Sequence, residues 1–290
     1  MGKRLLILGE SKQTGTLYLV GTPIGNLKDL TIRALETLQS VDLIAAEDTR
    51  HTQKLLNHYA IQKPVTSYYE HNKNSKGPWL LEKLSDGVNI ALVSDAGMPG
   101  ISDPGEDLVK ACLQKKIPVT VIPGPSAILT ALVASGLDCK GFVFAGFFPR
   151  QKKEQKIIFS QLKEEKRTII FYESPYRLQK TLVQIKEAWG ERNCCVAREL
   201  TKVYEEYIRG TLSEVIAYWE QHTPKGEMTL LIEGARNEKD AAVTAVTAEQ
   251  IVQRYHEFLS KGLTKKEALQ ETADLLGISK REVYRLVMIK

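Results

Sequence analysis

Alternation between short apolar runs and segments of helical periodicity restricts the fold of this chain more than any other feature. Apolar runs rich in leucine and β-branched residues occupy residues 16–21, 41–46, 88–94 and 118–122. Between the first two runs, Ile32, Leu35 and Leu38 recur three positions apart, as on one face of a helix. Strands that alternate with helices are typical of a mostly parallel sheet covered by helices. We therefore predict an α/β domain over residues 16–123.

A second α/β domain is predicted over residues 124–236, because the rhythm of the sequence changes there. A helix between Gly124 and Gly136 precedes strand-like runs at residues 142–146, 168–172, 194–197, 204–209 and 228–233. Only six residues separate the runs 194–197 and 204–209, which indicates a hairpin. A hairpin is antiparallel, so this second sheet is predicted to be mixed. The predicted fold class is α/β, with two α/β domains.

Three segments lie outside these domains. Residues 1–15 form a basic tail, residues 237–247 a linker of small and polar residues, and residues 248–290 a helical module. Within this module, a turn at Gly277 and an N-cap at Ser279 indicate a helix-turn-helix outline. Its second helix carries the candidate RNA contacts Lys280, Arg281 and Arg285. A packing module with a solvated face is the alternative.

Composition limits the class of protein. Hydrophobic residues make up 43% of the chain, enough to build packed cores, which argues against disorder. No apolar run reaches the roughly 20 residues of a membrane span. The four cysteines show no C-x-x-C spacing, which indicates reduced thiols in a cytoplasmic protein. The net charge of +5 permits a nucleic-acid partner without demanding one.

Three loops rich in Gly and Pro, at residues 21–26, 94–105 and 123–127, follow apolar runs. Ligands of open α/β sheets bind at the carboxyl ends of the strands, where these loops are expected. The G-x-x-x-G spacing of Gly21 and Gly25 argues against a dinucleotide fingerprint. Within the second loop, Asp103 and Pro104 are predicted to start a helix. The five histidines form no H-x-x-x-H pair, so no metal site is predicted.

Charged residues follow several of the predicted strands. Glu47, Asp48 and Arg50 come directly after the second run, and Glu173 ends a later one. Charges are costly to bury at such positions, so these are candidate site residues, with structural ion pairs as the alternative. Over residues 150–167, Lys and Arg outnumber Glu by seven to three. This run is a candidate RNA contact, with a solvated helix face as the alternative.

Several motifs together resemble one family. They are LYLVGTPIGNLKDLTIRALETLQSVDLIAAEDTRHTQKLL, SDAGMPGISDPG, PGPSAILTALVASGL, FAGFFPR, FYESPYR and RELTKVYEE. These motifs are similar to those of the ribosomal RNA small subunit methyltransferase I family, in the tetrapyrrole methylase superfamily. The resemblance covers about residues 16–233, and the C-terminal helices resemble that family's appendage. Asn26 stands where the porphyrin-related methylases typically carry Asp, which favours the RNA branch.

The resemblance implies a methyltransferase that uses S-adenosylmethionine, bound between the two α/β domains. It implies 2′-O-methylation of a cytidine ribose in the decoding centre of 16S rRNA, within the small ribosomal subunit, by a homodimer. Carried over by position, the cofactor contacts are Pro23, Ile24, Asp95, Ala96, Gly97, Met98, Ser126, Ala127, Tyr172, Leu200, Met228 and Thr229. The alternatives are a same-fold methylase of a tetrapyrrole or other small substrate, and a non-catalytic ribosome-assembly factor.

Chemistry assigns roles to the remaining candidates. Ser126 and the free N–H groups at its helix start suit the carboxylate of the cofactor. A ribose hydroxyl has a high pKa, so a base helps to deprotonate it, and the candidates for this or for positioning are Glu47, Asp48 and Glu173. Arg50 is a further candidate at the catalytic site. The residues predicted to contact RNA phosphates are Arg50, Arg150, Lys152, Lys153 and Arg177.

Overall fold

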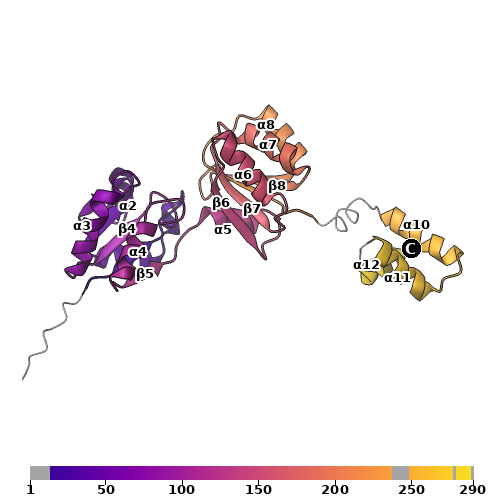
Figure 1. Cartoon of the computed structure of the whole chain (residues 1–290), viewed down its shortest axis with the longest axis horizontal. Helices are drawn as coiled ribbons and strands as arrows, with labels where there is room; N and C mark the ends of the chain where they lie inside the picture. The colour runs from indigo at the N-terminus through magenta and orange to yellow at the C-terminus, as the bar shows by residue number, and fades with distance from the viewer. Residues whose placement is uncertain (1–13, 237–247, 277–278, 289–290) are drawn as a thin grey trace, which may run out of the picture. The chain divides into compact units, whose positions relative to one another are not determined.

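The computed structural model describes residues 14–236, 248–276 and 279–288 (Figure 1). Most of the predicted tail, the predicted linker at residues 237–247 and the predicted turn at Gly277 lie outside the described residues. The chain divides into two compact units. The first unit contains both α/β domains, up to residue 162 and over residues 168–233. The second contains residues 163–167 and the helices from residue 234 onward.

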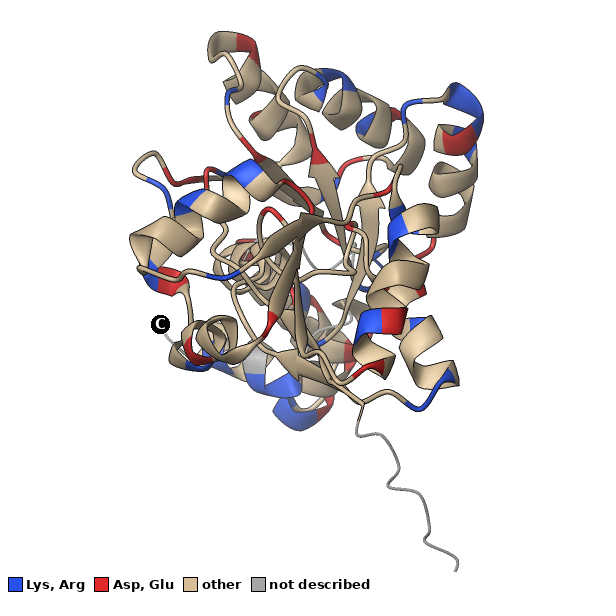
Figure 2. Ribbon diagram, turned by 90° about the vertical axis from the view of Figure 1, so that its left-hand side faces the viewer, with Lys and Arg blue, Asp and Glu red and all other residues tan. Residues whose placement is uncertain are grey.

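The first α/β domain is built on a parallel five-stranded sheet, as the alternating sequence predicts. In the order of the sheet the strands are β3 (Val65–Ser67), β2 (Leu43–Ala46), β4 (Ile90–Val93), β1 (Leu17–Val20) and β5 (Val119–Ile122). The helices between them are η1 (Leu27–Asp29), α1 (Ile32–Ser40), α2 (Thr49–His58), α3 (Lys73–Ser85) and α4 (Glu106–Gln114). Figure 2 shows basic and acidic residues mixed along the helices. The edge strand β3 was not predicted, because three residues are too few to show a period.

The buried face of α1 differs from the predicted stripe. Ala34, Thr37 and Leu38 are buried in α1, whereas Ile32 is 77% exposed. Ile32 is the first residue of the helix, which begins after its N-cap Thr31. The three-residue spacing from Ile32 to Leu38 is shorter than the helical repeat of 3.6 residues, so that stripe rotates around the helix. The prediction was therefore wrong for Ile32 and correct for Leu38.

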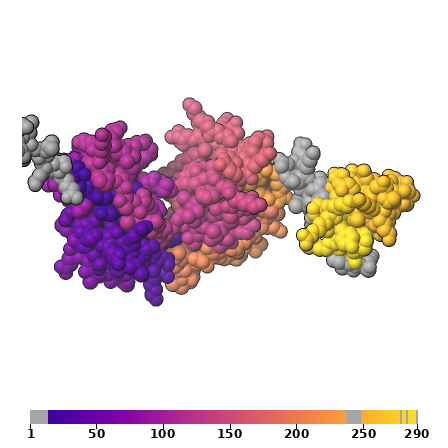
Figure 3. All heavy atoms as spheres, turned by 90° about the horizontal axis from the view of Figure 1, so that it is seen from below, coloured from indigo at the N-terminus to yellow at the C-terminus, as the bar shows by residue number. Residues whose placement is uncertain are grey.

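The second α/β domain contains a mixed sheet. In the order of the sheet the strands are β6 (Phe142–Phe147), β7 (Thr168–Glu173), β10 (Met228–Ile232), β8 (Asn193–Arg198) and β9 (Glu206–Thr211). Strands β6 and β7 are parallel and the other neighbours are antiparallel. The helices are α5 (Ala127–Ala134), α6 (Lys152–Leu162), α7 (Leu178–Trp189) and α8 (Leu212–Gln221). The spheres of the two α/β domains adjoin in Figure 3.

The predicted hairpin is confirmed as the pair β8 and β9. The second strand begins at Glu206, two residues later than the apolar run suggests. Glu199 and Thr201 adopt left-handed φ angles of 50° and 65°, and the turn that they form extends the connection to Glu205. The length of this turn determines where β9 begins, so the apolar run alone predicted a start that is two residues too early.

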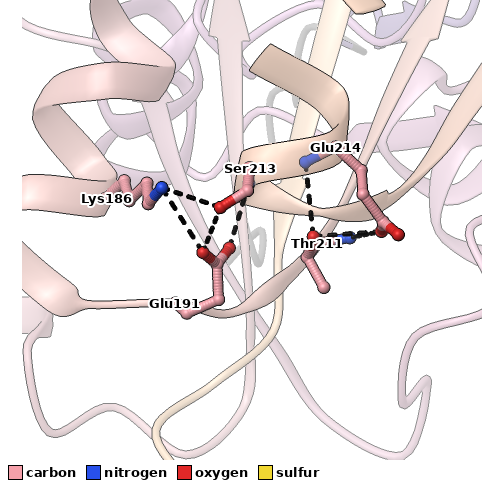
Figure 4. A network of polar contacts seen from close by, with 5 residues as sticks. All are labelled: Lys186, Glu191, Thr211, Ser213 and Glu214. Carbon is pink, nitrogen blue, oxygen red and sulfur yellow. Dashed lines mark hydrogen bonds and ion pairs between the residues drawn. The ribbon is translucent and has the colours of Figure 1, made fainter. Parts of the chain in front are cut away.

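A local network fixes the start of α8 (Figure 4). Thr211 and Glu214 form a capping box, in which each side chain accepts a hydrogen bond from the other residue's backbone N–H group. The Glu191 carboxylate accepts a hydrogen bond from the Ser213 backbone N–H at 3.0 Å and another from the Ser213 hydroxyl. Lys186 of α7 donates to the same hydroxyl at 2.7 Å. These contacts tie α7 to the first turn of α8.

In the described part of the second unit, the helices are α10 (Ala248–Ser260), α11 (Lys265–Leu276) and α12 (Lys280–Val287). They share a small apolar core in which Tyr255, Leu269 and Val283 represent the three helices. Helix α12 begins directly after Ser279. Among the described residues, no helix is both long and apolar enough to cross a membrane.

Candidate functional site

The three predicted loops meet at one edge of the first sheet. They follow β1, β4 and β5, which are neighbours in that sheet. The Thr22 and Gly97 backbones exchange two hydrogen bonds, with N–O distances of 2.9 and 3.0 Å. The Thr22 hydroxyl also donates to the Ser94 carbonyl at 3.1 Å. The loops after β1 and β4 are thus joined into one surface.

A close backbone contact joins the loops after β1 and β5. A Cβ atom at Gly21 would lie 2.8 Å from the Cα of Gly124 and 2.7 Å from the sulfur of Met98. Backbone atoms cannot move aside as a flexible side chain can, so both positions need glycine. Gly21 and Gly124, which both lie in predicted loops, therefore allow these two loops to approach each other closely.

A cavity of about 690 Å³ lies against these loops. This is a usual volume for a small-molecule site. Its other wall comes from the second domain, from the end of β7, the start of β10 and the loop after β8. Of the positions carried over as cofactor contacts, all but Pro23 line the cavity. The residues predicted from the resemblance as cofactor contacts come from both domains, and in the structure all of them except Pro23 line one cavity.

Several lining residues were not predicted from the sequence. Phe142, Phe144 and Phe147 of β6 line the cavity, as do Asp103 and Glu227. The alternation of Phe142 and Phe144 is the signal that two side chains share one face of a strand. Five acidic residues and no Lys or Arg belong to the described lining, namely Glu47, Asp95, Asp103, Glu173 and Glu227. The cavity is thus suited to a ligand that carries positive charge.

Asp103 does not start a helix, so that prediction was wrong. Helix α4 begins at Glu106 with Gly105 as its N-cap, because Gly105 has a φ of +148° that redirects the chain. Asp103 instead lines the cavity, as Asp95 and Glu47 do. Burial, and then the charge of Glu47, raise its pKa to about 6. The acidic residues in the first turn of α4 are Glu106 and Asp107, which suit the positive end of the helix dipole.

The pKa of Asp103 predicts a pH-dependent stability. Because its pKa is higher in the folded protein than in the unfolded chain, the folded state binds more protons between about pH 4 and 6, and stability falls as the pH rises through this window. Asp103→Asn removes the charge, so we expect it to raise the free energy of unfolding at pH 7.5 by about 1–2 kcal/mol, allowing for partial exposure. Urea unfolding at pH 4 and pH 7.5 checks this. An equal effect at the two pH values contradicts it.

Glu47 lies at the edge of the cavity with few partners. One of its carboxylate oxygens accepts the Asp95 backbone N–H at a long distance of 3.4 Å. Burial, and then the charge of Asp95, raise the pKa of Glu47 above its usual value. Asp95 in turn accepts the Asp48 backbone N–H at 3.0 Å, which joins the ends of β2 and β4. Of the three carboxylates predicted as bases, Glu47 is the one that both lines the cavity and has a raised pKa.

Asp48 and Arg50 have roles in local structure. Asp48 caps α2 by accepting the Arg50 backbone N–H at 2.8 Å. The Arg50 guanidinium binds the same carboxylate with Nη2–Oδ2 at 2.9 Å, and its hydrogen bonds lower the pKa of Asp48 to about 2. Neither residue lines the cavity. Such an acid holds its negative charge too firmly to serve as a base near neutral pH.

Glu173 and Arg177 form a buried pair. The side chain of Glu173 has no exposed surface and lies 2.5 Å from Arg177, measured from Oε1 to Nη2. The other oxygen accepts the Thr181 hydroxyl at 2.6 Å, and the Ser174 backbone N–H donates to Oε1. Arg177 also donates to the Phe148 carbonyl at 3.1 Å. These partners give Glu173 a structural role and hold the Arg177 guanidinium against it, with 27% of the Arg177 side chain exposed.

The other predicted RNA contacts lie on the surface. Arg150, Lys152 and Lys153 are exposed at the start of α6. Arg281 and Arg285 are exposed on α12, and Lys280 approaches Gln270 at 3.4 Å. Among the described residues, no group of three or more His, Cys, Asp or Glu side chains has an arrangement that would hold a metal ion.

Solved structures share the fold. A diphthine synthase superimposes with a TM-score of 0.59 at 13% identity, covering 76% of this chain and 90% of the other. The methyltransferase CobJ superimposes with a TM-score of 0.58 at 18% identity, covering 77% and 97%. At such low identities these likenesses establish the fold alone. The two-domain α/β architecture is therefore that of a known class of proteins.

Proteins of similar sequence identify the family of this chain. The sequence model of the Tetrapyrrole (Corrin/Porphyrin) Methylases matches residues 16–216. The Ribosomal RNA small subunit methyltransferase I of Bacillus subtilis (strain 168) is 49% identical over 294 residues and covers both chains completely. The protein of that name from Synechocystis sp. is 49% identical over 94% of this chain and 97% of its own. The chain therefore belongs to the ribosomal RNA small subunit methyltransferase I family, within the tetrapyrrole methylases.

Proposed function

We propose that this protein transfers a methyl group from S-adenosylmethionine to the ribose 2′-hydroxyl of a cytidine in the decoding centre of 16S rRNA, within the small ribosomal subunit. The observation that carries the proposal is the cavity bounded by the three loops of the first domain and the strand ends of the second. Its lining contains the residues carried over as cofactor contacts, apart from Pro23. The full-length similarity to proteins named as rRNA methyltransferases supports RNA as the substrate.

The residues of the cavity fit the cofactor. S-adenosylmethionine supplies a methyl group on a positively charged sulfonium. Acidic lining residues suit that positive charge, and apolar side chains such as Ile24, Leu200 and Met228 suit its nucleoside and thioether parts. The first N–H groups of α5 have no partner within the helix and line the cavity at Ala127 and Ile128, where they suit a carboxylate. The Ser126 hydroxyl is the N-cap and accepts the Leu129 N–H at 3.5 Å.

The lining also limits how tightly the ground state is held. A strongly anionic pocket would stabilise the sulfonium more than the transition state, in which the positive charge is disappearing. Part of the negative charge of the lining is already compensated, because Glu173 is paired with Arg177 and Glu227 with Lys202. We propose Glu47 as the base that takes the proton of the ribose hydroxyl, because it lines the cavity and its hydrogen bond with the Asp95 N–H is long, at 3.4 Å.

Transfer of label separates this function from the two alternatives. The assay supplies S-adenosylmethionine with a labelled methyl group and small subunits from a strain that lacks the modification. We expect label in one ribose of 16S rRNA. Label that appears only in a tetrapyrrole would identify a small-substrate methylase. Tight cofactor binding without transfer to subunits or to tetrapyrroles would identify an assembly factor.

We also propose that the protein is a cytoplasmic homodimer. A small-subunit substrate requires a cytoplasmic location. Among the described strands, β5 is an edge strand of the first sheet that pairs with β1 alone, and its Val121 is 49% exposed. Val133 on α5 is 74% exposed. An unpaired edge with apolar side chains suits self-association. Light scattering at micromolar concentration is expected to give twice the mass of the chain, and a mass of one chain would contradict this.

A further inference from the structure

A second hollow lies along one face of α2. It is lined by Thr49, Arg50, Gln53, Lys54 and Asn57 of the helix, and by Lys63 and Val65 at the start of β3. The helix residues recur at intervals of three and four, so they form one face. From Thr49 to Asn57 this face is about 12 Å long. We call it the α2 groove. It is open and wide, unlike an enclosed small-molecule site.

The α2 groove is basic and polar. Lys54 and Lys63 have no acidic partner among the described residues, whereas Arg50 is bound by Asp48. Gln53 and Asn57 are hydrogen-bonded to each other at 2.8 Å and present amide groups to the same face. No acidic residue belongs to the described lining. Two lysines that lack acidic partners, with amide and hydroxyl groups between them, suit the phosphate and ribose oxygens of a nucleic-acid strand.

The groove begins next to the cavity. Glu47 lines the cavity and Thr49 lines the groove, and two residues of chain span at most about 7 Å. A nucleotide held near Glu47 therefore has its neighbours in the strand within reach of the first turn of α2. A stacked strand advances about 3.4 Å along its axis per nucleotide, so a groove about 12 Å long spans roughly three nucleotides.

We propose that the α2 groove binds the phosphate backbone of the rRNA strand beside the target nucleotide, with Lys54 and Lys63 as its cations. This inference rests on the proposed function, since it takes RNA as the substrate. It assigns substrate binding to a surface of the first domain, apart from the RNA contacts that the sequence predicts on α6 and α12. The contact is to backbone and not to bases, so it adds affinity rather than sequence preference.

The test is the salt dependence of binding to unmodified small subunits. The variant is Lys54→Gln with Lys63→Gln in the full chain. The matched control is Lys115→Gln with Lys180→Gln, two exposed lysines outside both the groove and the cavity. We expect the groove variant to bind about tenfold more weakly near 0.1 M salt, and the slope of log K against log salt to flatten by about 1.5. The control changes the net charge equally and is expected to leave the slope unaltered.

The outcomes separate this proposal from the proposed function. Cofactor binding, measured by calorimetry, is expected to be the same for both variants and the wild type, which shows that they are folded. If the wild type methylates the subunits and the groove variant keeps the wild-type slope, the groove proposal is wrong and the function stands. Weaker binding with an unchanged slope would assign the groove to a ribosomal protein and also overturn the proposal. If the wild type neither binds nor methylates the subunits, the proposed function fails, and the groove proposal fails with it.

Discussion

Glu47→Gln is expected to lower the rate of methyl transfer by about 10²- to 10³-fold, a much larger effect than its effect on the affinity for S-adenosylmethionine. Glutamine has the shape of glutamate and keeps an oxygen that accepts the Asp95 N–H. It does not accept a proton from the ribose hydroxyl. Single-turnover transfer to unmodified small subunits, with both reactants saturating, measures the chemical step without the binding step.

Two controls make this test specific. Asp48→Asn makes the same chemical change one residue away, and Asn is as good an N-cap as Asp, so we expect a rate close to that of the wild type. The wild-type rate is expected to fall toward acid pH as Glu47 becomes protonated, and Glu47→Gln is expected to lack this acid limb. If Glu47→Gln keeps the wild-type rate, the base is another group or positioning alone suffices.

Arg177→Met is expected to destabilise the protein by about 3–5 kcal/mol, because it leaves the buried Glu173 carboxylate without its cation. At this scale the midpoint of thermal unfolding falls by roughly 10 °C or more. The replacement is expected to act on folding, since the guanidinium is held by Glu173 and by the Phe148 carbonyl. Differential scanning calorimetry of the full chain measures it.

The double variant Arg177→Met with Glu173→Gln tests the cause. Removing both charges removes the uncompensated carboxylate, so we expect this variant to recover much of the lost stability. Arg177→Lys keeps the charge without the planar fork and is expected to lose less than Arg177→Met. Full stability in Arg177→Met, together with weaker binding of small subunits, would instead support the role in phosphate binding suggested by the sequence.

Much of the fold was accessible from the sequence because it depends on local pattern. The apolar runs of the first domain each became a parallel strand, and the central strand β4, which is buried throughout, shows why such a strand is apolar along its whole length. The hairpin β8–β9 followed from the short spacing between its strands. Strand β3 was missed because its three residues are specified by pairing with β2 and not by their own pattern.

Only part of the candidate site could be predicted from the sequence. Gly21 and Gly124 were recognised as loop residues, but their backbones approach so closely that a Cβ at Gly21 would lie 2.8 Å from the Gly124 Cα, and this requires the strands β1 and β5 to be neighbours. Asn26, taken from the sequence as a mark of the RNA branch, accepts the Lys28 N–H at 3.1 Å and caps η1. Its side chain therefore has a local structural use, and substrate choice is better tested by the transfer of label.

The sequence by itself determined the α/β class, the loops at the strand ends and the family, because periodicity, glycine spacing and motif order are local properties of the chain. Only the tertiary structure decided what each acidic side chain does. Asp48 became a helix cap, Glu173 a buried partner of Arg177, and Glu47 and Asp103 carboxyls with raised pKa values facing a cavity. The physical reason is that the charge state and role of a carboxyl depend on its burial and on neighbours distant in the chain. Those neighbours come together only when the strands pair in the folded protein.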